Sequence, residues 1–263
     1  MLERFRNAKL SDIEHLKKQS SEGKLPEPYT GERPSFSQHI RDKGKGAVIA
    51  EYKRASPSRG PINLEYTPEE IAKAYKDGGA ACMSILTETC YFKGDTGYLE
   101  TMSSAGIPML RKDFLFHPLQ VDETAATKAS AMLLVARMHE KPEELQSLII
   151  RASQYGLECV VEIFDRDDLD LARAAGAKII QVNNRDLQNL STDLKRSKSF
   201  INEKRDGELW ISASGIFCGE QVQELGMLGY DAVLVGTSIM ESKDPQAAVE
   251  NLTGAKKLTG ARK

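Results

Sequence analysis

Short apolar runs alternate with helix-period segments along the chain from Ala47 onward, and these runs predict β-strands. The segments between them carry helix start and stop signals. TPEEIAKAYKDGG (67–79) begins at the cap residue Thr67, DRDDLDLARAAG (165–176) begins at Asp165, and both end in glycine. The predicted strands cover residues 47–53, 81–87, 108–114, 131–137, 158–164, 178–184, 209–215 and 232–238.

This order of elements predicts the fold class. A helix after each strand implies a crossover connection, so the strands should form a parallel sheet. Eight such units favour an α/β fold that closes into a (β/α)8 TIM barrel over an open doubly wound sheet. No G-x-G-x-x-G follows the first predicted strand, which argues against a dinucleotide-binding open sheet.

The first 46 residues follow a different pattern. They contain an amphipathic, charge-rich helix candidate at about 2–20, a polar stretch interrupted by prolines, and a short helix candidate at 36–41. We therefore predict an N-terminal helical extension (1–46) that packs on the outside or across one end of a barrel domain (47–257). Residues 258–263 would form a C-terminal tail.

Composition narrows the possible partners. The formal net charge is −2, so the bulk charge offers no attraction to nucleic acid or to an anionic membrane. No apolar stretch is long enough for a membrane span or a secretory signal, which favours a cytoplasmic protein. The four cysteines and four histidines show no metal-ligand spacing, and no exposed apolar helix requires a second subunit. These features predict a monomer without a metal site that acts on a small molecule.

Ionisable residues interrupt several of the predicted strands near their carboxyl ends. They are Glu51, Lys53, Lys112 and Glu162, and Asn183 stands at the corresponding place on the sixth strand. Charge inside a barrel is costly unless it is paired or used. A structural ring of salt bridges would satisfy the pattern, but (β/α)8 enzymes place their chemistry at this end, so we favour the functional interpretation.

Glycines and hydroxyl groups mark a second feature. The seventh predicted strand ends in Ser214-Gly215 and the eighth in Gly236-Thr237, and the loops after these strands commonly hold phosphate in this fold. A basic, hydroxyl-rich loop, KRASPSRG (53–60), follows the first strand and suits an anion. The alternative to a phosphate site is structural: the glycines would only turn the chain, and the basic loop would be an ordinary solvated loop.

These segments together resemble one family. IAEYKRASPSRG is similar to the first-strand signature of the indole-3-glycerol-phosphate synthases. The resemblance continues, in the family's order and over residues 47–240, through SILTETCYFKG, LRKDF, VVEIFD, VNNRDL, SASGI and VGTSIM. EYKRASPS and LRKDF form the most specific pair.

The resemblance implies a carboxy-lyase of tryptophan biosynthesis that uses neither a metal nor an organic cofactor. Its substrate would be 1-(2-carboxyphenylamino)-1-deoxyribulose 5-phosphate, which the family converts into indole-3-glycerol phosphate, carbon dioxide and water. Lys112 resembles the family's general acid. Lys53 resembles a lysine that contacts the substrate and assists later proton transfer, and Glu162 resembles the base for dehydration.

Other positions match residues that hold the substrate. Glu51 and Asn183 match residues that orient the anthranilate amine and the intermediate, and Ser214 matches an active-site serine. The resemblance further implies substrate contacts at Ser56 and Arg185, apolar walls at Phe92 and Phe114, and a phosphate site at Gly215, Gly236 and Thr237.

Two positions depart from the family pattern. Ala213 stands where a glutamate is usual, and Gln181 stands where a glycine is usual. They leave two alternatives open, a diverged paralogue acting on another phosphorylated sugar adduct and a non-catalytic phospholigand-binding barrel. A phosphoribosyl isomerase fits poorly, because its acid–base pair is expected to consist of aspartates or a cysteine with an aspartate.

Overall fold

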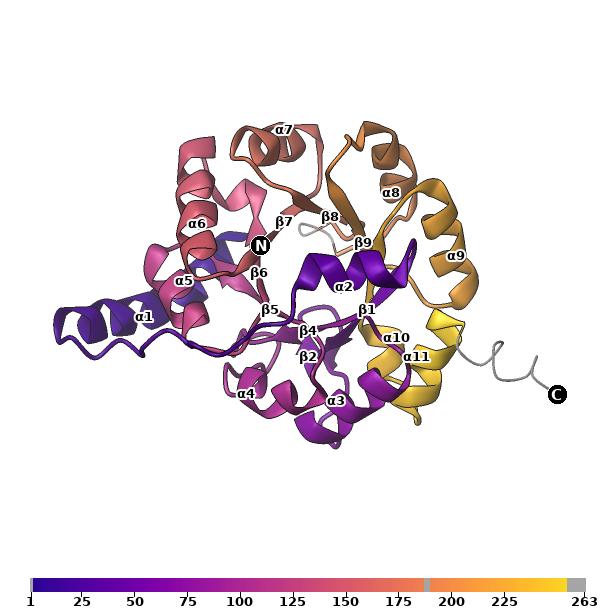
Figure 1. The fold of residues 1–263 in the computed structure, drawn as a ribbon, viewed down its shortest axis with the longest axis horizontal. Coiled ribbons are helices and arrows are strands. Elements are labelled where there is room, and N and C mark those ends of the chain that lie inside the picture. The colour runs from indigo at the N-terminus through magenta and orange to yellow at the C-terminus, as the bar shows by residue number, and fades with distance from the viewer. Residues whose placement is uncertain (1, 187–189, 255–263) are drawn as a thin grey trace.

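The computed structural model describes residues 2–186 and 190–254, and its centre is a closed barrel of parallel strands (Figure 1). The fold predicted from the sequence is confirmed. Neighbouring barrel strands pair in the order β1-β10-β9-β8-β7-β6-β5-β4. Their bounds are β1 (Ala47–Tyr52), β4 (Cys82–Leu86), β5 (Met109–Leu115), β6 (Ala131–Val135), β7 (Glu158–Ile163), β8 (Ile179–Asn183), β9 (Leu209–Ala213) and β10 (Ala232–Val235).

Helices surround the barrel, and a small hairpin of β2 (Ala55–Ser56) and β3 (Gly60–Pro61) follows β1. Thr67 and Asp165 are helix N-caps as predicted, each within a capping box. The helices after β1 are α3 (Pro68–Asp77), α4 (Tyr98–Met102), α5 (Pro118–Ala125), α6 (Pro142–Gln154), α7 (Arg166–Ala174), α8 (Lys195–Phe200), α9 (Gly219–Leu228), α10 (Thr237–Met240) and α11 (Pro245–Thr253).

All but one of the predicted strands were too long at their carboxyl ends, and the exception, 108–114, ended one residue before the end of β5 at Leu115. The run at 232–238 was wrong beyond Val235, because Thr237 already begins α10, and the run at 131–137 gives way to a 3-10 turn at Ala136. The hydrophobic pattern locates each strand but does not show at which residue the ladder hydrogen bonds stop.

Two apolar layers form the core. One fills the barrel interior, and the other lies between the strands and the surrounding helices, where Tyr75, Trp210 and Tyr230 are fully buried. Each buried large apolar side chain contributes about 1.5–3 kcal/mol to stability. The barrel is therefore a packed scaffold, and its carboxyl-end loops can carry function without supporting the fold.

Two helices precede the barrel. α2 (Phe36–Lys43) crosses the barrel in Figure 1, and its Phe36 and Ile40 are buried in the interior cluster. The Glu158 carboxylate at the start of β7 accepts the backbone N–H groups of the first turn of α2. α1 (Leu2–Ser21) contacts α5 and β5. α2 thus covers the amino-terminal end of the barrel, whereas α1 begins at the carboxyl end and extends outward over α5.

The predicted tail at 258–263, and the last residues assigned to the barrel domain, lie outside the described residues. Within the described ranges, no helix combines the length and the apolar character needed to cross a membrane.

Candidate active site

One pocket at the carboxyl ends of the strands collects the site residues predicted from the sequence. All of them line it, although they come from loops and strands distributed around the barrel. They are Glu51, Lys53, Ser56, Phe92, Lys112, Phe114, Glu162, Asn183, Arg185, Ser214, Gly215, Gly236 and Thr237.

Strand register arranges the inward-facing side chains in layers. Following the register around the barrel, with the regular stagger between neighbouring strands, places Glu51, Lys112, Glu162 and position 213 in one layer. Three members of this layer are charged, and the fourth is Ala213. The layer below holds Ser84, Leu133, Gln181 and Leu234.

Glu51 links the two lysines of the site. Its Oε1 lies 2.7 Å from Lys53 Nζ and its Oε2 lies 2.5 Å from Lys112 Nζ. Burial alone would raise the pKa of this carboxyl, but the two ammonium groups outweigh burial and lower the pKa to about 2. Glu51 is therefore an anion at neutral pH, and its two ion pairs hold both lysines at the floor of the pocket.

Glu162 has a different environment on the opposite side of the layer. Its Oε1 accepts Asn183 Nδ2 at 3.0 Å, and its Oε2 accepts Gln181 Nε2 at 2.6 Å. Burial raises the pKa of Glu162 above its ordinary value, although Lys112 and the two amides oppose the shift. Two carboxyls in one layer thus have pKa values moved in opposite directions, an arrangement that separates a permanent anion from a proton acceptor.

Asn183 is held in one orientation. Its Oδ1 accepts hydrogen bonds from the Ser214 hydroxyl and from the backbone N–H of Arg185, each at 3.0 Å. The amide nitrogen must therefore face Glu162. Ser214 itself has a left-handed backbone with φ of 72°, an uncommon conformation for a residue with a side chain, and it aims its hydroxyl at Asn183.

Two glycines at the pocket stand where a side chain would not fit, each for a different reason. A Cβ at Gly236 would lie 2.4 Å from Glu51 Oε1, so this glycine leaves room for the carboxylate between the lysines. Gly215 has φ of 78°, and a Cβ there would lie 2.5 Å from the Thr192 side chain. The sequence pattern predicted phosphate contacts at both positions, and the structure adds these packing requirements.

The loop after β1 faces the segment after β8. Arg185 Nη1 lies 3.5 Å from the Ser58 hydroxyl and donates to the Leu190 carbonyl at 3.0 Å. Burial lowers the pKa of the Arg185 guanidinium from its ordinary value, but arginine remains a cation at neutral pH. Ser56 lies 3.4 Å from Ser58, so hydroxyl groups and a cation face one side of the pocket.

Aromatic rings form another wall. Phe5 of α1 stacks on Phe114 with ring centroids 4.2 Å apart, and Phe92 packs at 6.3 Å from both rings. The sequence analysis missed Phe5. Its apolar helix position predicts burial but cannot show that α1 docks at the pocket, because that docking depends on contacts distant in sequence.

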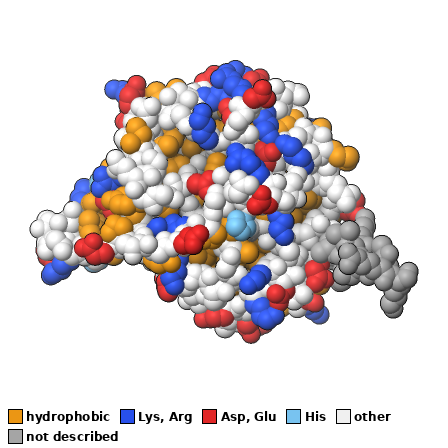
Figure 2. Space-filling view, viewed as in Figure 1, with side chains coloured by type: hydrophobic (Ala, Val, Ile, Leu, Met, Phe, Trp, Pro, Cys, Tyr) orange, Lys and Arg blue, Asp and Glu red, His pale blue; other side chains and the backbone are white. Residues whose placement is uncertain are grey.

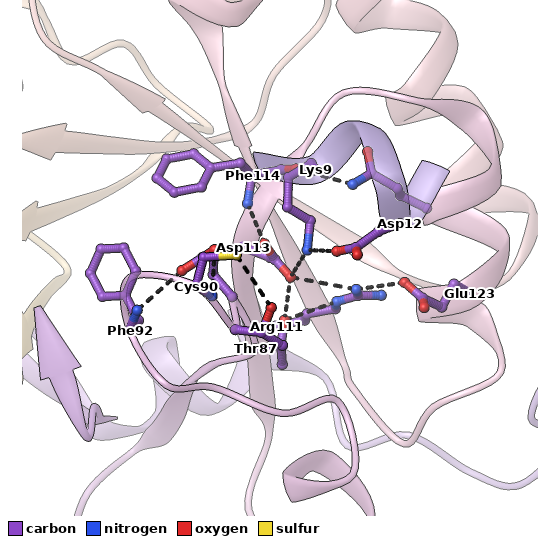
Figure 3. Close-up of polar contacts among 12 residues, drawn as sticks. Lys9, Asp12, Thr87, Cys90, Phe92, Arg111, Asp113, Phe114 and Glu123 are labelled. Atoms are coloured by element: carbon purple, nitrogen blue, oxygen red, sulfur yellow. Dashed lines mark hydrogen bonds and ion pairs between the residues drawn. The ribbon is translucent and has the colours of Figure 1, made fainter. Parts of the chain in front are cut away.

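Charged residues behind this wall attach α1 to β5 (Figure 3). The buried Lys9 ammonium lies 3.2 Å from Asp113 Oδ2, which also accepts the Thr87 hydroxyl at 2.8 Å. Arg111 donates to Glu123 at 2.6 Å and to Thr124 at 2.9 Å. These contacts give Arg111 and Asp113 a structural role beside the pocket.

No cluster of three or more His, Cys, Asp or Glu side chains within the described ranges is arranged to hold a metal ion. The chemically useful groups of the pocket are two ammonium groups, two carboxyls, amides and hydroxyls. The closed barrel and this lysine–glutamate layer at its carboxyl end define a class of protein, a (β/α)8 barrel whose site carries groups suited to acid–base chemistry.

Comparison with known proteins specifies the family. The indole-3-glycerol phosphate synthase family model matches residues 2–252. The protein of that name from Syntrophobacter fumaroxidans is 36% identical over 252 residues, which is 94% of this chain and 95% of its own. The one from Aquifex aeolicus is 40% identical over 210 residues, which is 79% of this chain and 81% of its own. The chain belongs to the indole-3-glycerol phosphate synthase family, whose members are decarboxylating lyases of tryptophan biosynthesis.

Solved structures show the shared fold. The 3-hexulose-6-phosphate synthase from Salmonella typhimurium superposes with a TM-score of 0.63 at 16% sequence identity, covering 81% of this chain and 99% of its own. Identity at this level supports the barrel architecture alone.

Proposed function

We propose that the protein converts 1-(2-carboxyphenylamino)-1-deoxyribulose 5-phosphate into indole-3-glycerol phosphate, with release of carbon dioxide and water. The observation that carries this proposal is the convergence of Lys53, Lys112 and Glu162 in one pocket of a chain that belongs to the synthase family. The reaction needs a proton donor and a proton acceptor close together, and this layer offers both.

The pocket suits the two ends of this substrate. Gly215, Gly236 and Thr237 line the part of the pocket where the phosphate would bind, and Arg185 adds a cation to the same pocket. At the other side the stacked Phe5 and Phe114 offer flat apolar surface to the anthranilate ring. A substrate bound in this way would place its carbonyl above the charged layer.

Lys112 is the proposed acid for ring closure. The ring carbon that bears the carboxylate attacks the ketone carbon, while the Lys112 ammonium gives a proton to the ketone oxygen. Loss of carbon dioxide then restores the aromatic ring and leaves a hydroxyl on the new five-membered ring. Glu51, 2.5 Å from Lys112 Nζ, keeps this ammonium in place.

Lys53 and Glu162 are the proposed pair for the dehydration that follows. Lys53 assists departure of the hydroxyl as water by supplying a proton. Glu162 removes the ring proton whose departure creates the new double bond. Burial is the main cause of the raised pKa of Glu162, and the raised pKa makes this carboxylate a stronger base than an exposed glutamate. No metal or organic cofactor takes part in this scheme.

The remaining expectations also belong to the proposal. A net charge of −2 and interspersed acidic and basic side chains on the face shown in Figure 2 support a protein that binds no nucleic acid. A cytoplasmic location and a monomeric state are the other parts of the proposal. Size-exclusion chromatography with light scattering checks the monomer, and a peak of twice the chain mass would overturn it.

The reaction is tested with purified protein and synthetic substrate. We expect indole fluorescence to rise, a product with the mass of indole-3-glycerol phosphate, and one carbon dioxide released per product molecule. Absence of indole product at saturating substrate would refute the assignment.

Ala213 supports a second candidate, a paralogue that acts on another phosphorylated sugar adduct. This alanine leaves the charged layer with one carboxylate fewer than the family pattern. The variant Ala213→Glu separates the candidates. A large gain in synthase rate would favour divergence, and an unchanged or lower rate would favour the synthase as it stands.

A further inference from the structure

We propose that Gln181 is a positioning residue of this site, holding the Glu162 carboxyl in its working orientation in both the anionic and the protonated state. The role assigned to Glu162 rests on the proposed function. The contact between Gln181 and Glu162 does not depend on it. Gln181 is fully buried and does not line the pocket, so it acts through Glu162 rather than on the substrate.

Strand geometry brings the two side chains together. Gln181 on β8 pairs in register with Glu162 on β7, and both face the barrel interior. The Gln181 Nε2–Glu162 Oε2 distance of 2.6 Å is shorter than the Asn183 contact of 3.0 Å on the other oxygen. Each carboxylate oxygen thus accepts one amide N–H, which fixes the plane of the carboxyl group.

The two amides differ in freedom. Asn183 Oδ1 accepts two hydrogen bonds, so turning its amide would break them. Gln181 Oε1 is buried and has no hydrogen-bond partner among the described residues. Turning the Gln181 amide therefore breaks only its bond to Glu162 and presents Oε1 to the carboxyl. That orientation accepts a hydrogen bond from protonated Glu162, so Gln181 can serve Glu162 before and after it takes a proton.

The charges around Glu162 explain why such support matters. Lys112 and Glu51 act on Glu162 through space from β5 and β1, and the two amides of β8 contact it directly. Lys112 makes its hydrogen bond to Glu51. Across β9, position 213 offers only a methyl group. The buried carboxylate thus depends on amide donors, and the loss of one leaves an oxygen unsatisfied.

The main test compares Gln181→Met with Ser84→Ala. Methionine keeps the length of the side chain and removes its hydrogen bond. Ser84 lies in the same interior layer, and its buried hydroxyl has no partner among the described residues, so it serves as a matched control. We expect Gln181→Met to lower kcat by about 10- to 100-fold, with little change in KM, and to move the acid limb of kcat to higher pH. Ser84→Ala should do neither.

A second variant and an NMR titration test the same role if Gln181→Met fails to fold or shows no activity. Gln181→Glu places a second carboxyl beside Glu162, so the two should share a proton and the acid limb should move further upward. Titration of ¹³C-labelled glutamate carboxyls by NMR, with Glu162→Gln for assignment, reports Glu162 without any turnover. We expect it to protonate at higher pH in Gln181→Met than in the wild type.

The outcomes separate the two proposals. A wild type that forms no indole product refutes the function, while the NMR titration still decides the role of Gln181. An active wild type whose kcat profile and Glu162 titration are unchanged in folded Gln181→Met, and in Gln181→Glu, refutes the positioning role.

Discussion

At the scale of single residues, the site places two carboxyls in opposite electrostatic environments. Glu51 is shared by two ammonium groups and stays ionised, whereas Glu162 is held by amides and has a raised pKa because of its burial. The sign of each shift follows from the partners: cations stabilise the anion, and a dry, neutral environment disfavours it.

The raised pKa of Glu162 predicts the acid limb of the activity. As pH falls, Glu162 takes a proton and can no longer act as a base, so kcat should decline at a pH above the ordinary range of a glutamate. Glu51 is still ionised there. Steady-state kinetics across pH measure the limb. A limb at or below the ordinary glutamate range would contradict the base role.

Part of the site could be predicted at this scale. Lys53, Lys112 and Glu162 stand out because a charge within an apolar strand requires a reason. The contact of Gln181 with Glu162 and the space that Gly236 leaves for Glu51 could not be predicted. Both depend on which residues of neighbouring strands lie side by side, and a one-residue change in register would abolish them.

At the scale of elements, α1 forms part of the pocket wall. Phe5 stacks on Phe114, and Lys9 pairs with Asp113 one residue from Lys112. The strand that carries the proposed acid is thus braced by a helix far away in sequence. Helix periodicity predicted α1, but it contains no information about which surface receives the helix.

The Lys9–Asp113 pair predicts a stability effect. Lys9→Met removes one of the two cations beside the buried Asp113 carboxylate, and only Arg111 and the hydrogen-bond donors remain. We therefore expect a loss of about 3 kcal/mol in unfolding free energy, the lower end of the cost of breaking a buried ion pair. Lys17→Met on the same helix breaks an exposed pair with Glu14 and should change stability little. Urea unfolding of both variants makes the comparison. Equal, small losses would show that the buried pair does not anchor α1.

At the scale of the whole molecule, the fold and the proposed function both involve the same layer of charges. The barrel keeps Glu51 buried at the cost of its hydration, and the two lysines compensate. The closed architecture was predictable from the alternation of strands and helices, because few topologies accommodate eight such units. The position of α2 over the amino-terminal end could not be predicted. The sequence pattern allowed the N-terminal extension to pack either on the outside of the barrel or across one of its ends.

This arrangement predicts acid sensitivity. The folded pKa of Glu51 is about 2, below its ordinary value of 4.5, so its contribution is complete above pH 4.5 and is lost as pH falls toward 2. Wild type should lose about 3 kcal/mol more unfolding free energy than Glu51→Gln over that window. Urea unfolding at a series of pH values measures both. Parallel pH dependence would contradict the ionised bridge.

The central claim, that Lys112 is the acid of a synthase, is tested most directly by the initial rate of indole fluorescence at saturating substrate. Lys112→Ala is compared with the wild type and with Lys128→Ala, a lysine that pairs with Glu100 outside the pocket. We predict that Lys112→Ala lowers kcat by about 10²- to 10⁴-fold while Lys128→Ala retains the wild-type rate. A Lys112→Ala variant as fast as the wild type would contradict the account.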